Sequence, residues 1–263
     1  MKIISLYYHN PIISGFEKMI KHFQNRGYRF ISVDELSEIM HQEIAINDKL
    51  VFLSLDDGWR QNLKLIPLIE KYNVPICIFI STEPVLSGNF WWEYVSKTRN
   101  RAELEKFKNL PYEDFYNQLQ KIKSQIKLER SAMTKDEVIE ISKHPLVSIQ
   151  AHTVNHPILT TQPDEVVEME MKESKHILEE WTGHKIFAFS YPNGRNTKRE
   201  ADTARKYFDI SFTTIHGHIH KGQDIMLLPR YGLTGQWPRD LLKAWGIWKV
   251  IKRLGTMVGY KSY

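Results

Sequence analysis

The chain has 263 residues, which is long enough for one large domain or two small ones around a substantial buried core. Its 42% hydrophobic and 25% charged residues are ordinary for a globular protein and exclude a fibrous or low-complexity chain. The net charge of +5 fits an anionic partner, such as an acidic glycan, a phospholipid headgroup or a nucleotide-linked sugar, without selecting one. The single cysteine, Cys77, excludes an intrachain disulfide and lies in an apolar run, where we interpret it as a small core residue.

The sequence shows neither the pattern of a signal peptide nor that of a membrane span. The apolar stretch 3–8 is too short for the core of a signal peptide, and no stretch approaches the length of a membrane span. We therefore expect a cytoplasmic protein.

Strand and helix patterns alternate along the chain. A helix is expected from Ser14, because Ser14 and Glu17 have the form of a capping box, and a short one is expected after Asp34, which could cap it. Another helix follows the strand 49–55 and ends near Tyr72, and one more is expected near 198–207. A long helix is expected over Asp164–Thr182, ended by Gly183. The expected strands are 2–8, 29–33, 49–55, 75–81, 146–150, 186–190, 209–214 and, near the end, Met226–Pro229.

This alternation predicts an α/β fold with parallel strands inside and helices outside. The number of units is close to that of a (β/α) barrel, complete or lacking a unit. An open doubly wound sheet is the alternative, although the glycine-rich phosphate loops typical of that class are missing.

Two segments depart from the alternation, so we divide the chain into a barrel over residues 1–235, with a helical insertion at about 86–145, and a basic amphipathic segment over 236–263. Trp91 and Trp92 in the insertion can form a sugar-stacking platform or pack in its core. The C-terminal segment mixes tryptophan with lysine and arginine, and it can pack on the barrel as a terminal helix or contact the inner face of an anionic membrane.

Polar residues suited to hydrolysis follow the predicted strands. In parallel barrels the working residues lie at the carboxyl ends of the strands, so side chains at these positions should meet at one mouth. The residues concerned are His9, Asp56, Asp57, His152, His156 and Tyr191.

Asp57, His152 and His156 are the candidate metal ligands. Imidazole and carboxylate suit zinc and its neighbours, and three protein ligands leave a position open. Pro157 disfavours helical geometry at His156, which favours a tight loop after the strand. The adjacent carboxylates of Asp56 and Asp57 repel each other at a buried strand end, which a metal would relieve while leaving Asp56 free as a base. A pair of histidines at this spacing also arises by chance in a chain with eleven.

Three motifs resemble those of the polysaccharide deacetylases, carbohydrate esterase family four. They are Ser54-Leu-Asp-Asp-Gly58, Ala151-His-Thr-Val-Asn-His156 and Phe189-Ser-Tyr-Pro-Asn-Gly194. Their order and spacing agree with the family, and the resemblance covers roughly residues 1–235. It implies a distorted (β/α) barrel of about seven parallel strands.

The resemblance also implies roles for individual residues. Asp56 would be the catalytic base, and Asp57, His152 and His156 would hold a divalent metal, usually Zn²⁺, with Co²⁺, Ni²⁺ or Mn²⁺ as alternatives. The backbone N–H of Tyr191 would help to stabilise the oxyanion. A late general-acid motif is missing, but Tyr8-His9 is similar to the permuted early motif of the branch that includes poly-N-acetylglucosamine deacetylases, so His9 would be the general acid.

The third motif departs from the family pattern because Ser190 stands where the family has an arginine that orients the base. Arg230, after the last expected strand, can take its place or be an ordinary surface arginine. Tyr7 is interpreted as a core residue of the first strand. His216, His218 and His220 alternate in a way that could bind metal, but the flanking glycines favour a solvated loop.

The function expected from these residues is metal-dependent removal of N-acetyl groups from an N-acetylated glycan or a sugar precursor. The alternatives are an O-acetyl esterase acting on a polysaccharide, and a non-catalytic glycan-binding barrel. A nucleic-acid partner is not expected, because the basic residues are spread along the chain rather than clustered with aromatic residues.

Overall fold

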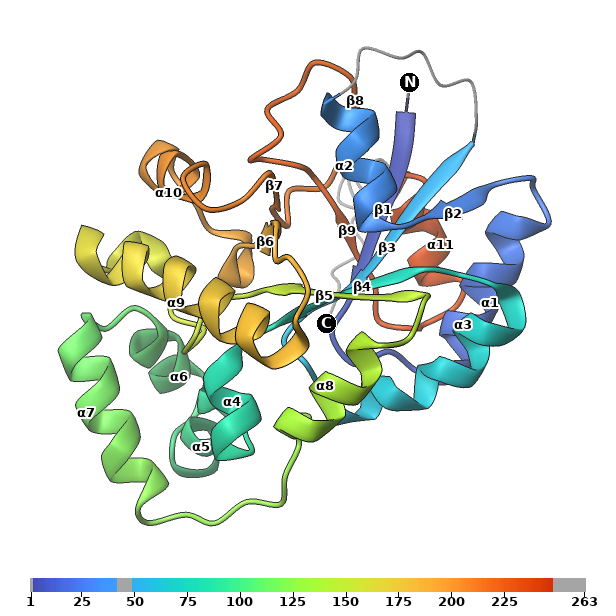
Figure 1. The fold of residues 1–263 in the computed structure, drawn as a ribbon. Helices are drawn as coiled ribbons and strands as arrows, with labels where there is room; N and C mark the ends of the chain where they lie inside the picture. The colour runs from blue at the N-terminus through green and yellow to red at the C-terminus, as the bar shows by residue number, and fades with distance from the viewer. Residues whose placement is uncertain (1, 42–48, 248–263) are drawn as a thin grey trace, which may run out of the picture.

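The computed structural model describes residues 2–41 and 49–247, which form a curved sheet with helices around its outside (Figure 1). Across these residues, no helix combines the length and apolar character needed to span a bilayer. The strands are β1 (Lys2–Tyr8), β2 (Arg29–Ile31), β3 (Leu50–Leu55), β4 (Ile76–Ile80), β5 (Val147–Ala151), β6 (Ala188–Ser190), β7 (Ile210–Phe212), β8 (Ile219–His220) and β9 (Tyr231–Gly232). The helices are α1 (Ile13–Gln24), α2 (Val33–His41), η1 (Arg60–Leu65), α3 (Ile66–Tyr72), α4 (Thr82–Ser87), α5 (Trp91–Thr98), α6 (Arg101–Lys108), α7 (Tyr112–Lys123), α8 (Lys135–Ser142), η2 (Leu159–Thr161), α9 (Asp164–Thr182), η3 (Pro192–Gly194), α10 (Lys198–Ala204) and α11 (Arg239–Ala244).

Seven strands run parallel in the order β7-β6-β5-β4-β3-β1-β9, which confirms the predicted distorted (β/α) barrel. The parallel strand β2 pairs with the first half of β3, and β4 pairs with its end. Strand β8 is antiparallel to the start of β1. Sequential strands from β2 to β7 therefore lie side by side, whereas β1 pairs with β3 and is joined by β8 and β9 from the end of the described chain.

The segment 225–233 crosses the gap between the two ends of this sheet. Leu228 forms a parallel bridge with Phe212 of β7, and Tyr231 pairs with Leu6 of β1. The expected strand Met226–Pro229 is therefore wrong in its extent, because a single bridge forms there and the paired strand begins at Tyr231. Pro229 has no N–H to continue a ladder, which explains the interruption.

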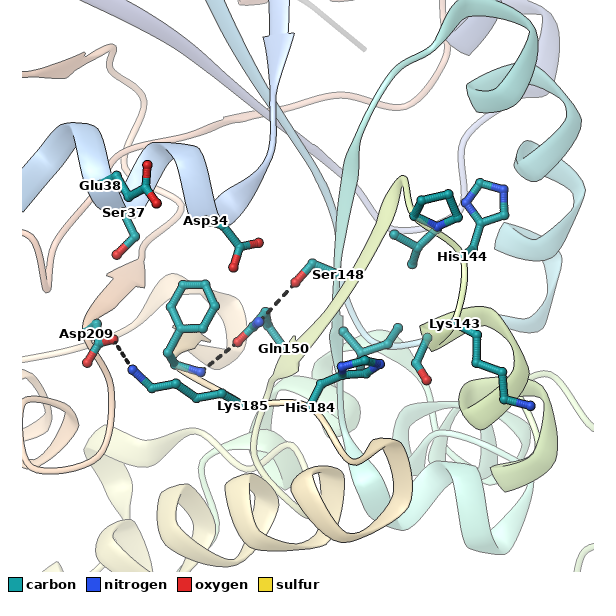
Figure 2. A pocket seen from close by; sticks show the side chains of 15 residues that line it. Asp34, Ser37, Glu38, Lys143, His144, Ser148, Gln150, His184, Lys185 and Asp209 are labelled. Carbon is teal, nitrogen blue, oxygen red and sulfur yellow. Dashed lines mark hydrogen bonds and ion pairs between the residues drawn. The ribbon is translucent and has the colours of Figure 1, made fainter.

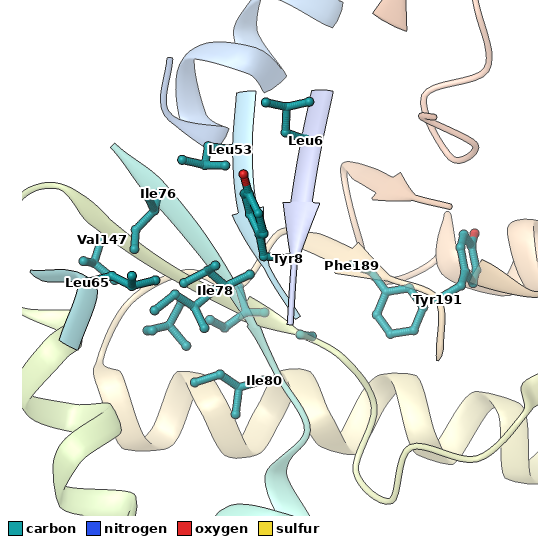
Figure 3. Close-up of a cluster of buried hydrophobic side chains, with 14 of the residues drawn as sticks. Leu6, Tyr8, Leu53, Leu65, Ile76, Ile78, Ile80, Val147, Phe189 and Tyr191 are labelled. Carbon is teal, nitrogen blue, oxygen red and sulfur yellow. The ribbon is translucent and has the colours of Figure 1, made fainter. Parts of the chain in front are cut away.

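The strands are buried on both faces, and alternate side chains enter two different cores. On the outer face, residues such as Leu53 and Ile78 pack beneath the helices, as Figure 3 shows. On the inner face, Phe52, Cys77 and Phe79 fill the barrel, so Cys77 is the buried core residue that the sequence predicts.

Two predicted helix caps are wrong. Helix α1 begins at Ile13, its N-cap position is Ile12, and no side chain caps it, so Ser14 already lies inside the helix. Glu17 instead accepts a hydrogen bond of 2.5 Å from the hydroxyl of Tyr72. Helix α2 is capped by Ser32, whose hydroxyl accepts from the N–H of Glu35, and Asp34 lies in its first turn.

Helix α9 matches the prediction, because it covers Asp164–Thr182 and ends at Gly183 in the left-handed conformation with φ of 69°. Helices α5, α6 and α7 form a small cluster of their own, centred on Trp91, Phe107 and Phe115. Figure 1 shows this group at the lower left, beside α4.

The described start of the C-terminal segment packs on α1. Trp245 contacts the rings of Phe23 and Tyr28, and Trp237 contacts His22. The rest of the predicted amphipathic segment, residues 248–263, lies outside the described residues.

The histidine-rich stretch after β7 is only partly a solvated loop. Ile219 is fully buried and pairs with Ile3 of β1, so the flanking glycines do not keep the stretch out of the sheet. Among the described residues, His216, His218 and His220 belong to no cluster of potential metal ligands.

Candidate active site

The carboxyl ends of the parallel strands bring the predicted side chains to one mouth of the barrel. Asp56 and Asp57 follow β3, and His152 and His156 follow β5. These four residues are at most 5% exposed. Because β3, β4 and β5 are neighbours in the sheet, the two pairs lie one strand apart.

Asp57, His152 and His156 form a compact triad. Oδ1 of Asp57 lies 3.4 Å from the Nε2 atoms of both His152 and His156, and the three potential ligand atoms lie within 4.8 Å of one another. Asp57 has φ of 79° and His156 has φ of 56°, a left-handed conformation that non-glycine residues seldom adopt. Such conformations persist where the surroundings hold them, and they are common at functional sites.

The hydrogen bonds around the triad leave its inner atoms without partners. His152 donates from Nδ1 to the carbonyl of Ser190 at 2.6 Å, so in the neutral ring Nε2 carries a lone pair toward Asp57. Among the described residues, no hydrogen bond reaches Oδ1 of Asp57. Lone pairs of two imidazoles and a carboxylate that face one another in a buried site fit a divalent cation between them.

The protonation of the triad suits metal binding. Burial acts to raise the pKa of Asp57, but nearby His9, His152 and His156 hold that pKa well below its usual value. Burial lowers the pKa of His156, against the opposing effect of Asp57. Asp57 is therefore anionic and His156 neutral at pH 7, and these are the forms that bind a metal.

Two tryptophans contact residues of the triad, and the sequence did not predict either contact. Trp59 donates from its indole nitrogen to Oδ2 of Asp57 at 2.9 Å, and Trp91 donates to the carbonyl of His156 at 3.0 Å. The only sequence signal for Trp59 is its place directly after Asp-Asp-Gly. Trp91 comes from the insertion, so its partner could not be inferred from spacing.

Asp56 is bound by Arg230 rather than by the triad. The two guanidinium nitrogens of Arg230 lie 2.8 Å from the two carboxylate oxygens of Asp56. Burial acts to raise the pKa of Asp56, but the charge and hydrogen bonds of Arg230, together with the nearby His152 and His9, lower that pKa below its usual value. Asp56 is thus ionised and does not belong to the cluster of potential metal ligands, as a general base requires.

Arg230 is fully buried inside the barrel, which excludes the surface-arginine interpretation. It donates to the hydroxyls of Ser54 at 2.9 Å and Ser190 at 2.7 Å. Ser190, which stands in the third motif where the family has an arginine, therefore contacts Arg230. The guanidinium lies 4.4 Å from the ring centre of Tyr7. Tyr7 is therefore more than a strand core residue, because its ring supports Arg230.

A cavity of about 310 Å³ opens beside the triad. His9 is exposed and lines it together with Asp57 and His156. Trp92 also lines the cavity, and its ring stacks on Phe90 with centroids 4.8 Å apart. The remaining lining residues are Trp59, Trp91, Leu104, Lys108 and Asn193.

The prediction that the N–H of Tyr191 faces the site is wrong. That N–H donates to the carbonyl of Phe212 at 3.1 Å, as part of the pairing of β6 with β7. Asn193, two residues later, lines the cavity in a left-handed conformation with φ of 55°. Its backbone N–H has no acceptor among the hydrogen bonds of the described chain, so it is the available donor at this position.

A second cavity, of about 530 Å³, lies away from this site, near the amino ends of β5 and β6 (Figure 2). There the strands diverge, and the side chain of Gln150 accepts hydrogen bonds from the N–H groups of Phe187 and Ala188. None of the candidate catalytic or metal-binding residues lines it.

Comparison with known proteins adds to this geometry. A model of the polysaccharide deacetylase family matches residues 44–208. That range includes Asp56, the triad and the third motif, whereas His9 and Arg230 lie outside it. The chain is 22% identical over 217 residues to YxkH of Bacillus subtilis, whose name places it among polysaccharide deacetylases; the match covers 82% of this chain and 62% of that protein.

Solved structures share the fold. The deacetylase PplD of Streptococcus pyogenes, in complex with acetate, superposes with a TM-score of 0.71 at 21% identity, covering 93% of this chain and 98% of that one. IcaB of Ammonifex degensii superposes with a TM-score of 0.70 at 18% identity, covering 94% and 97%.

Proposed function

Because the chain belongs to the polysaccharide deacetylase family, we propose that it hydrolyses the N-acetyl groups of amino sugars in a glycan or a glycan precursor. The observation that supports this most directly is an ionised carboxylate, Asp56, next to a buried triad of metal-ligand type at one end of the barrel. This arrangement supplies a base and a metal site side by side.

The triad would hold a divalent metal, Zn²⁺ by preference, through Oδ1 of Asp57 and Nε2 of His152 and His156. When bound, the metal would act as a Lewis acid toward the acetyl carbonyl and lower the pKa of water at the site. Trp59 would orient the carboxylate of Asp57, and the carbonyl of Ser190 would orient the ring of His152.

Asp56 would take the proton from the attacking water as the carbon–oxygen bond forms. Arg230 holds both carboxylate oxygens and fixes the plane of the base. The backbone N–H of Asn193 would donate to the oxyanion that develops on the acetyl oxygen. His9, which also lines the cavity, would act as the general acid and deliver a proton to the leaving amine as the carbon–nitrogen bond breaks, because an amine is a poor leaving group as an anion.

The cavity walls support a sugar as the substrate. Trp92 offers an aromatic surface beside His156, with ring centroids 4.8 Å apart, and aromatic faces provide large apolar contact areas for sugar rings. Trp92 thus fits the platform role, while Trp91 packs among Phe107 and Phe115.

The test is acetate release from soluble N-acetylglucosamine oligomers by protein stripped with a chelator and then reloaded with Zn²⁺. We expect release only with metal. Asp56→Asn should lose release by about 10²-fold or more and keep stoichiometric metal, since Asp56 makes no ligand contact. His152→Ala should lose both.

Substrate choice separates the competing functions. His9→Ala should slow amide hydrolysis more than hydrolysis of an activated acetyl ester, because an ester leaving group needs less help from an acid. Release from an O-acetylated polysaccharide alone would identify an esterase. Binding of the oligomers without acetate release, in metal-loaded protein, would contradict the proposal and identify a glycan-binding barrel.

A further inference from the structure

The loop between His152 and His156 needs support from its surroundings. Thr153 and His156 both have left-handed backbones, with φ of 68° and 56°, and each such residue costs roughly 1–2 kcal/mol. The loop is short and carries two of the three triad residues. What fixes its peptide groups therefore also fixes the direction of both imidazoles.

Helix α4 binds the carbonyl groups of this loop. The N–H of Thr82 donates to the carbonyl of Thr153 at 3.3 Å, and the N–H of Glu83 donates to the carbonyl of Val154 at 2.9 Å. These bonds satisfy two carbonyl groups of the loop, but the backbone N–H groups of the loop need other acceptors.

Glu170 of α9 binds those N–H groups. Its Oε2 accepts from the backbone N–H of Val154 at 2.8 Å and of Asn155 at 2.9 Å, and its Oε1 accepts from the side-chain amide of Asn155 at 2.7 Å. The side chain is completely buried, and across residues 2–41 and 49–247 no cation forms an ion pair with it. Burial raises its pKa to about 7 in spite of the three donors.

Among the described residues, this carboxyl group therefore belongs to no network of ion pairs. Burying it is unfavourable unless hydrogen bonds compensate, and all of its partners belong to this one loop. Glu170 does not line the cavity, and its hydrogen bonds go to Val154 and Asn155 rather than to the three triad side chains. These bonds therefore act on the loop between His152 and His156.

We infer that Glu170 is a positioning residue for the metal site, which holds the loop 153–155 so that both imidazoles face Asp57. This inference rests on the metal triad of the proposed function. It assigns Glu170 no contact with substrate or metal. Loss of its hydrogen bonds should loosen the two histidines together and weaken metal binding.

The experiment measures Zn²⁺ affinity of chelator-stripped, full-length protein by competition with a chromogenic chelator. Glu170→Ala should weaken Zn²⁺ binding by about 10–100-fold, the usual effect of removing a partner that orients metal ligands. Glu170→Gln keeps one acceptor oxygen and should lose much less. Glu168→Gln is the matched control, because Glu168 lies on the same helix, bonds to Tyr207 and does not reach the loop; its affinity should equal that of the wild type.

Thermal unfolding of the metal-free variants separates positioning from general stability. If Glu170→Ala is less stable but, when folded, binds Zn²⁺ as tightly as the wild type, the inference is overturned. Should that variant fail to fold, Glu170→Asp keeps the charge but is one methylene too short, and wild-type affinity in it would likewise overturn the inference. Because the readout is Zn²⁺ alone, absence of acetate release in a protein that shows the expected affinities contradicts the deacetylase proposal and leaves this one standing.

Discussion

Asp56 and Arg230 are 174 positions apart in the chain and form a two-pronged ion pair inside the barrel. Neither side chain is more than 3% exposed, so each charge depends on the other for compensation. The pair brings together the end of β3 and the segment that crosses between β7 and β1. The position of Asp56 therefore depends on the segment that closes the barrel.

Replacing Arg230 by methionine should lower the free energy of unfolding by about 3–5 kcal/mol, because Asp56 is left buried without its partner. The double variant Arg230→Met with Asp56→Asn should recover part of that loss, since it removes both charges. Chemical denaturation of the four proteins in this cycle measures the coupling. If the loss in the double variant equals the sum of the losses in the two single variants, the pair contributes no coupling.

The site residues that directly follow a predicted strand could be identified from the sequence. Asp57 follows β3 and His152 and His156 follow β5, two buried strands that can be recognised locally, so their meeting could be inferred from topology. Asn193 could not be chosen over Tyr191, because which N–H remains free depends on the pairing of β6 with β7.

At the scale of elements, helix α5 links the insertion to the metal site. The indole of Trp91 donates to the carbonyl of His156, and its ring packs against Phe107 and Phe115 in the same small cluster. Trp59, which follows β3, packs against Phe90 of the insertion and donates to Asp57. The insertion therefore contacts His156 directly and Asp57 through Trp59, so it is part of the site rather than a separate appendage.

Trp91→Phe should keep the ring packing and remove the hydrogen bond to His156. We expect a loss of about 1–3 kcal/mol in the free energy of unfolding, since a buried carbonyl is left unsatisfied, and weaker Zn²⁺ binding by about tenfold. Trp181→Phe is a suitable control, because its indole makes no hydrogen bond within the described chain and it packs on the outer core. Identical Zn²⁺ affinities in the two variants would refute the link.

Elements were predictable from sequence in proportion to their length. The 19-residue helix α9 and the apolar strand β3 carry enough periodic residues to be recognised locally. Strands β8 and β9 have two residues each and exist only because β1 pairs with them. The capping box at Ser14 is wrong because the helix begins at Ile13, which places Ser14 inside the first turn.

For the whole molecule, closure of the barrel depends on how the chain after β9 packs against α1. The N–H of Ile12 donates to the carbonyl of Thr234 at 3.2 Å. The buried carboxylate of Asp240 accepts from the N–H groups of Thr234 and Gly235 at 2.8 and 2.6 Å. This turn anchors the end of the segment that carries Arg230 across the sheet.

Gly15 is the point of closest approach in this closure. A Cβ atom at Gly15 would lie 1.7 Å from the carbonyl oxygen of Gly235, so the backbone itself would have to move. Gly15→Ala should therefore lower the free energy of unfolding by about 1–3 kcal/mol or more, the usual range for overpacking. Because the displaced segment carries Arg230, acetate release by folded protein should fall as well. Ser14→Ala, one residue earlier on an exposed position without a capping bond, should change stability by less than about 0.5 kcal/mol. Chemical denaturation and acetate release should be measured for both variants. If Gly15→Ala behaves like Ser14→Ala in both measurements, the contact between Gly15 and Gly235 does not control the position of the catalytic base.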